Sequence, residues 1–471
     1  MPARSRGEKR TRLAITHPAA KVCPSCHAPA PPGRRICRKC YTNIEGATTA
    51  AMPSRAQRPR GIVWLLSLGW RGWFGLAAAA VLVVFAARTA LDLRPAPPLP
   101  APRVTALSVQ AQPAVWPMAD GGVGGGRVTT AAPVLDGEIA WSRALSAPIV
   151  TAPVTDGAQV FLGLEDARLV ALSVADGREL WSVPVPGQLD DAPTLVGDWL
   201  YLGQRDGRVV ALDTTTGEQR WASRVADGIY SSPAVADGVV YVVSSNRLLA
   251  LDAEDRTVLA DIEVGSWGNN ISPVVSQERV VAATGGRILF FDRATGEQPF
   301  FARLRNPRHV ATAGDMVVAM SAKSILGLGL DGSTPWWEGI RGLWTSLHLH
   351  EMAPAVPQPY RWAMPAKGDA FAPVLTADRV FIASAGGSVQ ALDLASGGLL
   401  WEIESAPLAA APLLTASGLL VVEREALVLL DPDTGAELSR RELPGIALRS
   451  VTVVDGATFL VTETDELLAL R

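Results

Sequence analysis

Short apolar runs separated by glycine and aspartate turns fill the chain from residue 136 onward. The stretch APTLVGDWLYLGQRDGRVVALDTTTGEQRW, residues 192–221, contains four such runs, and a turn rich in Gly, Asp or Thr stands between each run and the next. Apolar runs of this length between turn residues are typical of antiparallel strands. The pattern therefore predicts a four-stranded sheet within this stretch.

The same order of runs recurs at a nearly constant spacing, which is the mark of an internal repeat. ALDTTTGEQRW (211–221) aligns with ALSVADGRELW (171–181), FFDRATGEQPF (290–300), ALDLASGGLLW (391–401) and LLDPDTGAELS (429–439). With the aspartate of ALD as the marker, the steps are 40, 39, 40, 39, 62, 38 and 40 residues, between Ser173, Asp213, Asp252, Asp292, Asp331, Asp393, Asp431 and Arg471. Four-stranded sheets at this spacing indicate a β-propeller, so the predicted fold class is all-β, with eight blades over residues 132–471.

The two ends of the repeat region complement each other. LDGEIAW (135–141) matches only the end of a repeat, and the chain stops at ELLALR, where that end is missing. We therefore expect the N-terminal strand to be the outermost strand of the last blade, which closes the ring.

Each repeat ends in residues suited to joining neighbouring blades. Asp213 can accept hydrogen bonds from turn N–H groups, Gly217 permits the positive φ of the turn, and Trp221 can lie across the next sheet with its indole N–H bonded to backbone. The tryptophan position of the eight repeats holds Trp141, Trp181, Trp221, Ala260, Phe300, Trp336, Trp401 and Ser439. Blades three and seven, which have Ala260 and Ser439 there, are expected to dock more weakly.

Charge and cysteine content divide the 471-residue chain into two parts. Residues 1–71 carry 14 Lys and Arg against Glu8 and Glu45, a net charge of +12, so the remaining residues carry −15 of the overall −3. Such a division indicates two environments and no nucleic-acid-binding domain. All four cysteines precede residue 41, so the propeller can form no disulfide.

The cysteines form two C-x-x-C pairs in CPSCHAPAPPGRRICRKC, residues 23–40. Two such turns supply the four thiolates of a tetrahedral zinc site. We therefore predict a structural Zn²⁺ held by Cys23, Cys26, Cys37 and Cys40 in a module over residues 21–45. The module resembles the zinc ribbons at the N-termini of many prokaryotic membrane proteins; redox pairs or disulfides are the alternative.

Residues 62–87 are apolar except for Ser67 and Arg71. A transmembrane helix over 72–91 keeps Arg71 and Arg88 near its ends, with 62–71 as an interfacial segment; a buried soluble helix is the alternative. Arginines before the span predict a cytoplasmic N-terminus and a propeller in the periplasm or at the cell exterior. A disordered basic tail (1–20), a basic linker (46–61) and a Pro/Gly-rich stalk (92–131) are expected around these elements.

The motif A-x-D-x-x-T-G-x-x-x-W resembles the tryptophan-docking repeats of the pyrroloquinoline-quinone-like propeller family, over nearly all of residues 133–471. Enzymes of that family place a vicinal Cys-Cys disulfide against the quinone and hold Ca²⁺ through an inner carboxylate and amide. No cysteine follows Cys40, and no residues match the calcium ligands. The chain thus looks more similar to a non-catalytic relative, the accessory propeller lipoprotein of the outer-membrane β-barrel assembly machinery. No catalytic residue, quinone or Ca²⁺ is expected.

The 62-residue step places an insertion at residues 337–362, which we expect to connect the fourth strand of one blade to the first strand of the next. Tryptophan, tyrosine and arginine are enriched at binding hot spots, and loops on a rigid scaffold often carry function. The candidate partner-binding residues are Trp337, Arg341, Trp344, Tyr360, Arg361 and Trp362; a self-packed cap is the alternative. His348, His350 and Glu351 are candidate metal ligands, with solvated side chains as the alternative.

Further polar residues of the loops are candidates for lining the mouth of the central channel, or else for satisfying loop backbone. They are Asp190, Asp191, Tyr230, Trp267, Asn269, Asn270 and His309.

Together these patterns predict a single-pass membrane protein whose propeller is a protein-interaction scaffold at the cell envelope, with proteins and the membrane as partners. A quinone-dependent dehydrogenase and a transmembrane sensor that couples propeller binding to the zinc ribbon are the alternatives. The sequence identifies no small-molecule ligand.

Overall fold

The computed structural model describes residues 20–24, 29–30, 35–36, 43–47, 49–50, 80–84, 116–244, 246–264, 271–293, 297–298, 300–332, 340–350, 352–353 and 360–471. The chain divides into two compact units, Met1–Arg88 and Thr89–Arg471.

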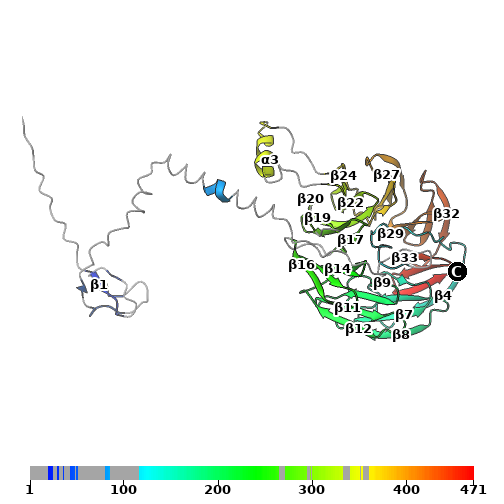
Figure 1. Cartoon of the computed structure of the whole chain (residues 1–471), viewed down its shortest axis with the longest axis horizontal. Coiled ribbons are helices and arrows are strands. Elements are labelled where there is room, and N and C mark those ends of the chain that lie inside the picture. Colours follow the sequence, from blue (N-terminus) through cyan, green and yellow to red (C-terminus); the bar gives the residue numbers. More distant parts are fainter. Residues whose placement is uncertain are drawn as a thin grey trace, which may run out of the picture. The chain divides into compact units, whose positions relative to one another are not determined.

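The larger unit is a β-propeller of eight four-stranded antiparallel sheets (Figure 1). Blade 1 contains β5 (Val154–Thr155), β6 (Gln159–Gly163), β7 (Arg168–Ser173) and β8 (Glu179–Pro184), and blade 2 contains β9 (Thr194–Val196), β10 (Trp199–Gly203), β11 (Arg208–Asp213) and β12 (Gln219–Arg224). Blade 3 contains β13 (Ala234–Ala236), β14 (Val239–Ser244), β15 (Arg247–Asp252) and β16 (Val258–Glu263), and blade 4 contains β17 (Val274–Val275), β18 (Arg279–Thr284), β19 (Arg287–Asp292) and β20 (Phe300–Arg303).

Blade 5 contains β21 (Pro307–Ala313), β22 (Met316–Ser321), β23 (Ser324–Gly329) and β24 (Trp362–Pro365), and blade 6 contains β25 (Val374–Leu375), β26 (Arg379–Ala383), β27 (Ser388–Asp393) and β28 (Leu399–Glu404). Blade 7 contains β29 (Leu408–Thr415), β30 (Gly418–Glu423), β31 (Ala426–Leu430) and β32 (Glu437–Glu442), and blade 8 contains β33 (Leu448–Val454), β34 (Ala457–Thr462), β35 (Glu466–Leu470) and β4 (Ile139–Ala144). The first strands of neighbouring blades contact each other, for example β9 with β13 and β25 with β29, and therefore surround the centre of the ring.

The second and third strands of each blade form the core between neighbouring sheets. All six residues of β14 are buried, whereas five of the six residues of β12 are exposed or half-buried. A continuous apolar run is what a strand covered on both faces requires. This burial explains why the repeats read as uninterrupted runs such as VVYVVS.

The N-terminal strand closes the ring. β4 pairs antiparallel with β35, and Trp141 lies opposite Ala469. The last blade therefore takes three strands from the C-terminus and its outermost strand from residues 139–144. The predicted all-β propeller, its eight blades and this closure are confirmed.

Residues 116–134, which we call the strap, follow the first strands of the blades around the centre of the ring. Trp116 is buried, and first-strand N–H groups donate to strap carbonyls: Thr155 to Trp116 (3.0 Å), Leu195 to Pro117 (2.8 Å), Val275 to Val123 (2.9 Å), Thr312 to Gly124 (2.8 Å), Leu375 to Gly126 (3.0 Å) and Leu414 to Arg127 (3.1 Å). The N–H of Val134 then donates to the Thr458 hydroxyl (2.9 Å).

The strap corrects the expected stalk over 92–131, because its part from Trp116 onward lies within the propeller. A Cβ on Gly124 would lie 3.1 Å from the carbonyl oxygen of Thr312, and Gly125 has φ +67°. The glycines therefore permit close approach to neighbouring strands and are not part of an extended stalk. Residues 92–115 lie outside the described residues.

In the smaller unit, β1 (Ala20–Val22) pairs with β2 (Pro29–Ala30) and β3 (Thr49–Ala50). Residues 80–84 are helical, but the rest of the predicted span 72–91 and the segments 1–19 and 51–71 lie outside the described residues. Among the described residues, we find no helix with the length and apolar character needed to cross a membrane.

Candidate functional site

Five tryptophans join consecutive blades through one recurring hydrogen bond. The indole N–H donates to the backbone carbonyl that follows the third strand of the next blade: Trp141 to Val174 (3.1 Å), Trp181 to Thr214 (2.9 Å), Trp221 to Ala253 (3.0 Å), Trp362 to Leu394 (2.7 Å) and Trp401 to Pro432 (3.0 Å). Each bond satisfies a carbonyl at a strand end while the ring covers the adjoining turn. Each tryptophan therefore joins its own blade to the next blade.

The turn beneath each tryptophan explains the remaining residues of the motif. Asp213 accepts hydrogen bonds from the N–H groups of Thr215 (2.9 Å) and Thr216 (3.0 Å). Gly217 has φ +73°, and a Cβ there would lie 2.7 Å from the ring of Trp181. Glycine thus serves both the left-handed turn and the flat surface that the indole covers.

Three repeats lack a tryptophan at this position. Phe300 stacks on Phe290 with centroids 4.3 Å apart, and a Cβ on Gly332 would lie 2.6 Å from its ring. Ala260 lies opposite Ala250, and Ser439 lies opposite Leu429, in the register that places tryptophan elsewhere.

The fifth blade corrects the predicted position of the insertion. Trp362 lies opposite Gly327 on β23, in the register that Trp221 has opposite Ala211, so β24 is the fourth strand and Trp362 is the docking residue. The insertion therefore connects the third and fourth strands of blade 5, and its assignment to the connection between blades is wrong. Trp336 and Trp337 lie outside the described residues.

Two more of the candidate partner-binding residues belong to the base of the insertion. Arg361 forms ion pairs with Asp315 (2.9 Å) and Asp331 (3.0 Å), and Tyr360 packs against the core between blades 4 and 5. Arg341 and Trp344 instead lie on α3 (Arg341–Leu349), a helix with no buried residue. The five candidates that the structure describes thus divide between the base of the insertion and α3.

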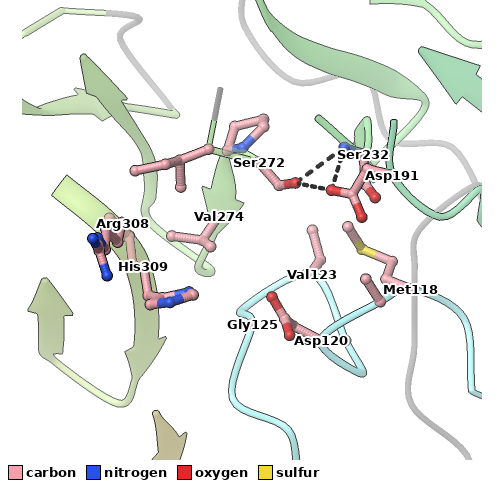
Figure 2. A pocket seen from close by; sticks show the side chains of 15 residues that line it. Met118, Asp120, Val123, Gly125, Asp191, Ser232, Ser272, Val274, Arg308 and His309 are labelled. Carbon is pink, nitrogen blue, oxygen red and sulfur yellow. Dashed lines mark hydrogen bonds between the residues drawn. The ribbon is translucent and has the colours of Figure 1, made fainter. Parts of the chain in front are cut away.

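A cavity of about 220 Å³ lies where the strap meets the first strands of blades 2 to 5 (Figure 2). Asp191 accepts hydrogen bonds from the N–H of Ala192 (2.8 Å), the N–H of Ser232 (3.0 Å) and the hydroxyl of Ser272 (3.2 Å). Figure 2 shows Asp120 and His309 elsewhere around the same cavity. The other side chains that line it include Met118, Val123, Val274 and Arg308.

Burial shifts the pKa values of Asp191 and His309, which line this cavity. Desolvation raises the pKa of Asp191, and the nearby charge of Asp120 raises it further, although hydrogen bonds from Ala192 and Ser232 act in the opposite direction. Desolvation also lowers the pKa of His309, which favours the neutral imidazole. The Ser232 hydroxyl donates to the Ala192 carbonyl (2.7 Å), and Asp191 accepts from residues of two other blades, so these groups join blades 2, 3 and 4.

One repeat position explains which residues line the cavity. It is alanine before a proline in blades 1, 2, 6 and 7, serine before a proline in blades 3 and 4 (Ser232 and Ser272), and His309 in blade 5. Comparing this one repeat position could have found the two serines that the sequence reading missed. Of the earlier loop candidates, Asp191 and His309 line the cavity, Asp190 binds Arg205 and Tyr230 lines a different hollow; positions 267, 269 and 270 lie outside the described residues.

A second residue set that sequence reasoning missed lies on the strap. The Arg127 side chain is 9% exposed; it forms an ion pair with Asp120 (2.7 Å) and donates to the carbonyls of Pro412 (2.9 Å) and Ala119 (3.0 Å). The guanidinium of Arg127 therefore joins strap residues 119 and 120 to the first strand of blade 7. A lone arginine among glycines gives no sequence signal for such a role.

The candidate metal ligands are only partly described. Cys23 is buried directly after β1, whereas Cys26, Cys37, Cys40 and Glu351 lie outside the described residues. His348 is exposed, with its Nδ1 3.1 Å from the Ala353 carbonyl oxygen. Within the described part of the chain, no group of three or more His, Cys, Asp or Glu side chains is arranged to hold a metal ion.

A family model described as outer membrane protein assembly factor BamB matches residues 123–227, 186–309, 321–426 and 385–471. A comparison with curated proteins gives no match. Among solved structures, BamB from Moraxella catarrhalis is 16% identical, with 70% of this chain and 85% of that chain covered and a TM-score of 0.46.

Two other solved structures are similar at higher TM-scores. The computationally designed Ika8 protein is 13% identical, with 71% of this chain and 99% of that chain covered and a TM-score of 0.56. The quinohemoprotein alcohol dehydrogenase from Comamonas testosteroni is 12% identical, with 76% and 80% covered and a TM-score of 0.55. At such identities the likeness shows the propeller fold alone.

Proposed function

The chain belongs to the family of the outer membrane protein assembly factor BamB, and from this premise we propose that its propeller is a protein-interaction scaffold at the cell envelope. The observation that carries the proposal is the insertion of blade 5. Its base is held by Arg361 and Trp362, while α3 has no buried residue. Binding residues often lie on loops that a rigid scaffold positions, and here the propeller positions the insertion that contains α3.

Crosslinking and pull-down from native membranes test this proposal. The full chain is compared with a variant in which residues 338–353 are replaced by a short Gly/Ser linker that leaves Tyr360, Arg361 and Trp362 in place. We expect the full chain to retain an envelope protein at constant stoichiometry. A chain without residues 1–20 is the control, because that deletion leaves the propeller unchanged. Absence of any propeller-dependent partner would contradict the scaffold function.

The cavity does not fit the quinone cofactor of the dehydrogenases that share this fold. Pyrroloquinoline quinone carries three carboxylates, and Asp120 and Asp191 would face them. The strap also occupies the centre of the ring, and the chain has no cysteine after Cys40 for a vicinal disulfide. Addition of the quinone and Ca²⁺ to the purified chain tests the rival function: alcohol- or sugar-dependent dye reduction would replace the scaffold proposal.

The proposal includes a structural zinc ribbon at the N-terminus. Val22 pairs with Pro29 across the first C-x-x-C, and Ile36 pairs with Asn43 across the second. In both, the residue before the first cysteine pairs antiparallel with the residue three positions after the second cysteine. The two turns thus share one register, as two equivalent zinc knuckles require. We expect one equivalent of zinc by elemental analysis, lost when Cys37 and Cys40 are both replaced by serine.

The proposal also includes a single membrane span at residues 72–91, with the N-terminus in the cytoplasm. Its support is the apolar sequence together with the exposure of Val81, Leu82, Val83 and Val84, each about two-thirds exposed on the helical residues 80–84. Resistance of the chain to carbonate extraction, and protection of the propeller from protease added to the cytoplasmic side, are the expected results. Release of the chain by carbonate would contradict the span.

A further inference from the structure

A groove of about 460 Å³ lies between blades 4 and 5, next to the base of the insertion. Arg303, at the end of β20, lines it on the side of blade 4. Leu326 of β23 and Met364 of β24 line it on the side of blade 5, together with Tyr360. We call it the basic groove. Its lining and that of the cavity at the strap have no described residue in common, so the two sites are separate.

The charged side chains that line the basic groove are all cationic. Arg303, Arg305 and Lys323 are exposed there, and none of the described lining residues is Asp or Glu. The guanidinium carbon of Arg303 already lies over the ring of Phe301, 5.6 Å from its centroid. Within the described part of the chain, the side chains of Arg305 and Lys323 form no hydrogen bond and no ion pair. These two cations are therefore available to a ligand.

The next charged residues along the chain are already paired with each other. Arg308 forms an ion pair with Asp369 (2.7 Å), and Lys367 pairs with Glu402. Residues 72–471 carry a net charge of −15, so two unpaired cations in one groove are an exception on an acidic chain. An acidic molecule that approaches the propeller is thus attracted to this groove and repelled by most of the remaining surface.

Comparison of the repeats shows that the two cations are particular to this pair of blades. Arg305 stands five residues after the docking position, where the other repeats have Ser146, Pro186, Ala226, Gly265, Lys367, Ala406 and Pro444. Lys323 stands in the turn between the second and third strands, where the other repeats have Ala167, Gly207, Asn246, Gly286, Gly387, Glu425 and Asp465. Of these counterparts only Lys367 is positive, and it is paired with Glu402. The propeller fold itself therefore does not require Arg305 and Lys323.

Apolar and aromatic side chains complete the lining. Leu304 and Leu326 are 5% and 4% exposed, and Met364 and Tyr360 are half-buried. Among the described residues, the Tyr360 hydroxyl has no hydrogen-bond partner. Tyrosine and arginine are enriched where proteins bind proteins, and Arg and Lys form charge-assisted hydrogen bonds with carboxylates. The groove therefore suits a segment that has both carboxylate and apolar side chains.

We propose that the basic groove binds an acidic segment of a partner protein. Carboxylate side chains of that segment accept hydrogen bonds from Arg305 and Lys323, and an apolar side chain packs on Leu326 and Met364. The Tyr360 hydroxyl donates to the same segment. This inference rests on the scaffold function and identifies the chemistry of one surface that the scaffold recognises.

A membrane surface fits the groove less well than an acidic segment does. Basic clusters that bind anionic lipid contain about four to eight Lys and Arg, whereas two cations are available here. The net charge of −15 on residues 72–471 also opposes approach to an anionic surface.

Site-specific photo-crosslinking of the full chain in native membranes tests the occupant. The photoreactive residue p-benzoylphenylalanine is placed at position 363, where the exposed Ala363 lines the groove, or at position 142, the equivalent place on β4 of blade 8. We expect a protein adduct from position 363 and none from position 142. Mass spectrometry of the adduct should place the crosslink in a segment with more Asp and Glu than Lys and Arg.

Charge reversal tests whether Arg305 and Lys323 hold that segment. Arg305→Glu with Lys323→Glu should abolish the adduct and weaken binding of the synthetic segment to the purified chain by about tenfold or more. Arg143→Glu with Arg224→Glu makes the same change in charge at two exposed arginines of β4 and β12, and binding should change by less than about threefold. Thermal unfolding of both variants checks that the propeller remains folded.

Salt provides a second readout of the charged contacts. Raising the salt concentration from about 0.1 M to about 1 M shortens the Debye length from about 10 Å to about 3 Å. We expect this change to weaken binding of the segment to the unmodified chain more than to the Arg305→Glu, Lys323→Glu chain. Equal salt dependence of the two chains would contradict a role of these cations.

The outcomes separate this inference from the scaffold function. An adduct that survives charge reversal in the groove, an adduct with phospholipid, or an adduct of twice the chain mass would overturn the proposed occupant. A partner that pull-down retains without any crosslink at position 363 would overturn the groove and leave the scaffold in place. Absence of every propeller-dependent partner would overturn both.

Discussion

The indole N–H of Trp362 donates to the backbone carbonyl of Leu394 at 2.7 Å, across the boundary between blades 5 and 6. Gly327 and Gly397 lie against the same ring, and a Cβ on either would come within 2.6 Å of it. This pair joins the ring at the one repeat whose spacing is irregular. It also fixes the strand order of the blade that carries the insertion.

Replacement of Trp362 by alanine should therefore destabilise the propeller. The side chain is 7% exposed, so its removal leaves a cavity and an unsatisfied carbonyl, at a cost of about 3 to 5 kcal/mol in the free energy of unfolding. Urea denaturation followed by intrinsic fluorescence measures the change. Trp336→Ala is the matched control and should cost less than about 1 kcal/mol; the reverse order of the two losses would contradict the strand assignment.

Trp221 occupies the equivalent position in blade 2 and is 6% exposed. Its indole contacts Tyr201 at a centroid distance of 6.0 Å and donates to Ala253. Trp221→Ala should cost about 3 to 5 kcal/mol, whereas Trp221→Phe should recover most of the packing and lose chiefly the hydrogen bond. A loss below about 1 kcal/mol for the alanine variant would refute docking as the role of this residue.

Arg127 gives a test of the strap. Its side chain is 9% exposed. The guanidinium donates hydrogen bonds to the carbonyls of Ala119 and Pro412 and forms an ion pair with Asp120. Arg127→Met keeps the length of the side chain but leaves these acceptors unpaired, which should cost about 3 kcal/mol. Hydrogen exchange at Leu414, whose N–H donates to the Arg127 carbonyl, should accelerate in the same variant. Unchanged exchange there would indicate that the strap is held without Arg127.

The ring could be predicted from sequence because each blade repeats the same strands and turn, and because β4 and β35 are incomplete without each other. The fourth strand of the fifth blade could not be predicted from the sequence. The strand register puts the repeat marker at Gly329, but Asp331, two residues later, looks like that marker in the sequence. Trp336 then fell at the expected spacing. Only the pairing of Gly327 with Trp362 reveals the true fourth strand.

The cavity and the strap were harder to predict for a related reason. Asp191 bonds to Ser272, 81 residues away, and the strap bonds to six blades through backbone atoms alone, which have no sequence signature. Gly124 and Gly125 have the composition of a flexible linker, but here they permit close approach of backbones. Local patterns predict elements, whereas contacts around a closed ring depend on its geometry.

The turn aspartates predict how the propeller responds to acid. Hydrogen bonding by Arg220, and then by the turn N–H groups of Thr216 and Thr215, lowers the pKa of Asp213 below its ordinary 3.8. The pKa of Asp393 is lowered by hydrogen bonds from Ser396, and that of Asp431 by the N–H groups of Thr434 and Asp433.

Because these carboxyl groups have a lower pKa in the folded chain than in the unfolded chain, their stabilisation is fully present above about pH 5. It is lost as the pH falls through 3.8 toward the folded values. The variant with Asp213→Asn, Asp393→Asn and Asp431→Asn should be less stable than the unmodified chain at pH 7, and the difference should shrink below pH 4. Thermal unfolding from pH 7 to pH 3 measures both chains. A difference that stays constant over this range would show that the three carboxylates titrate alike in the folded and unfolded states, and that neutral turn hydrogen bonds alone hold the blades.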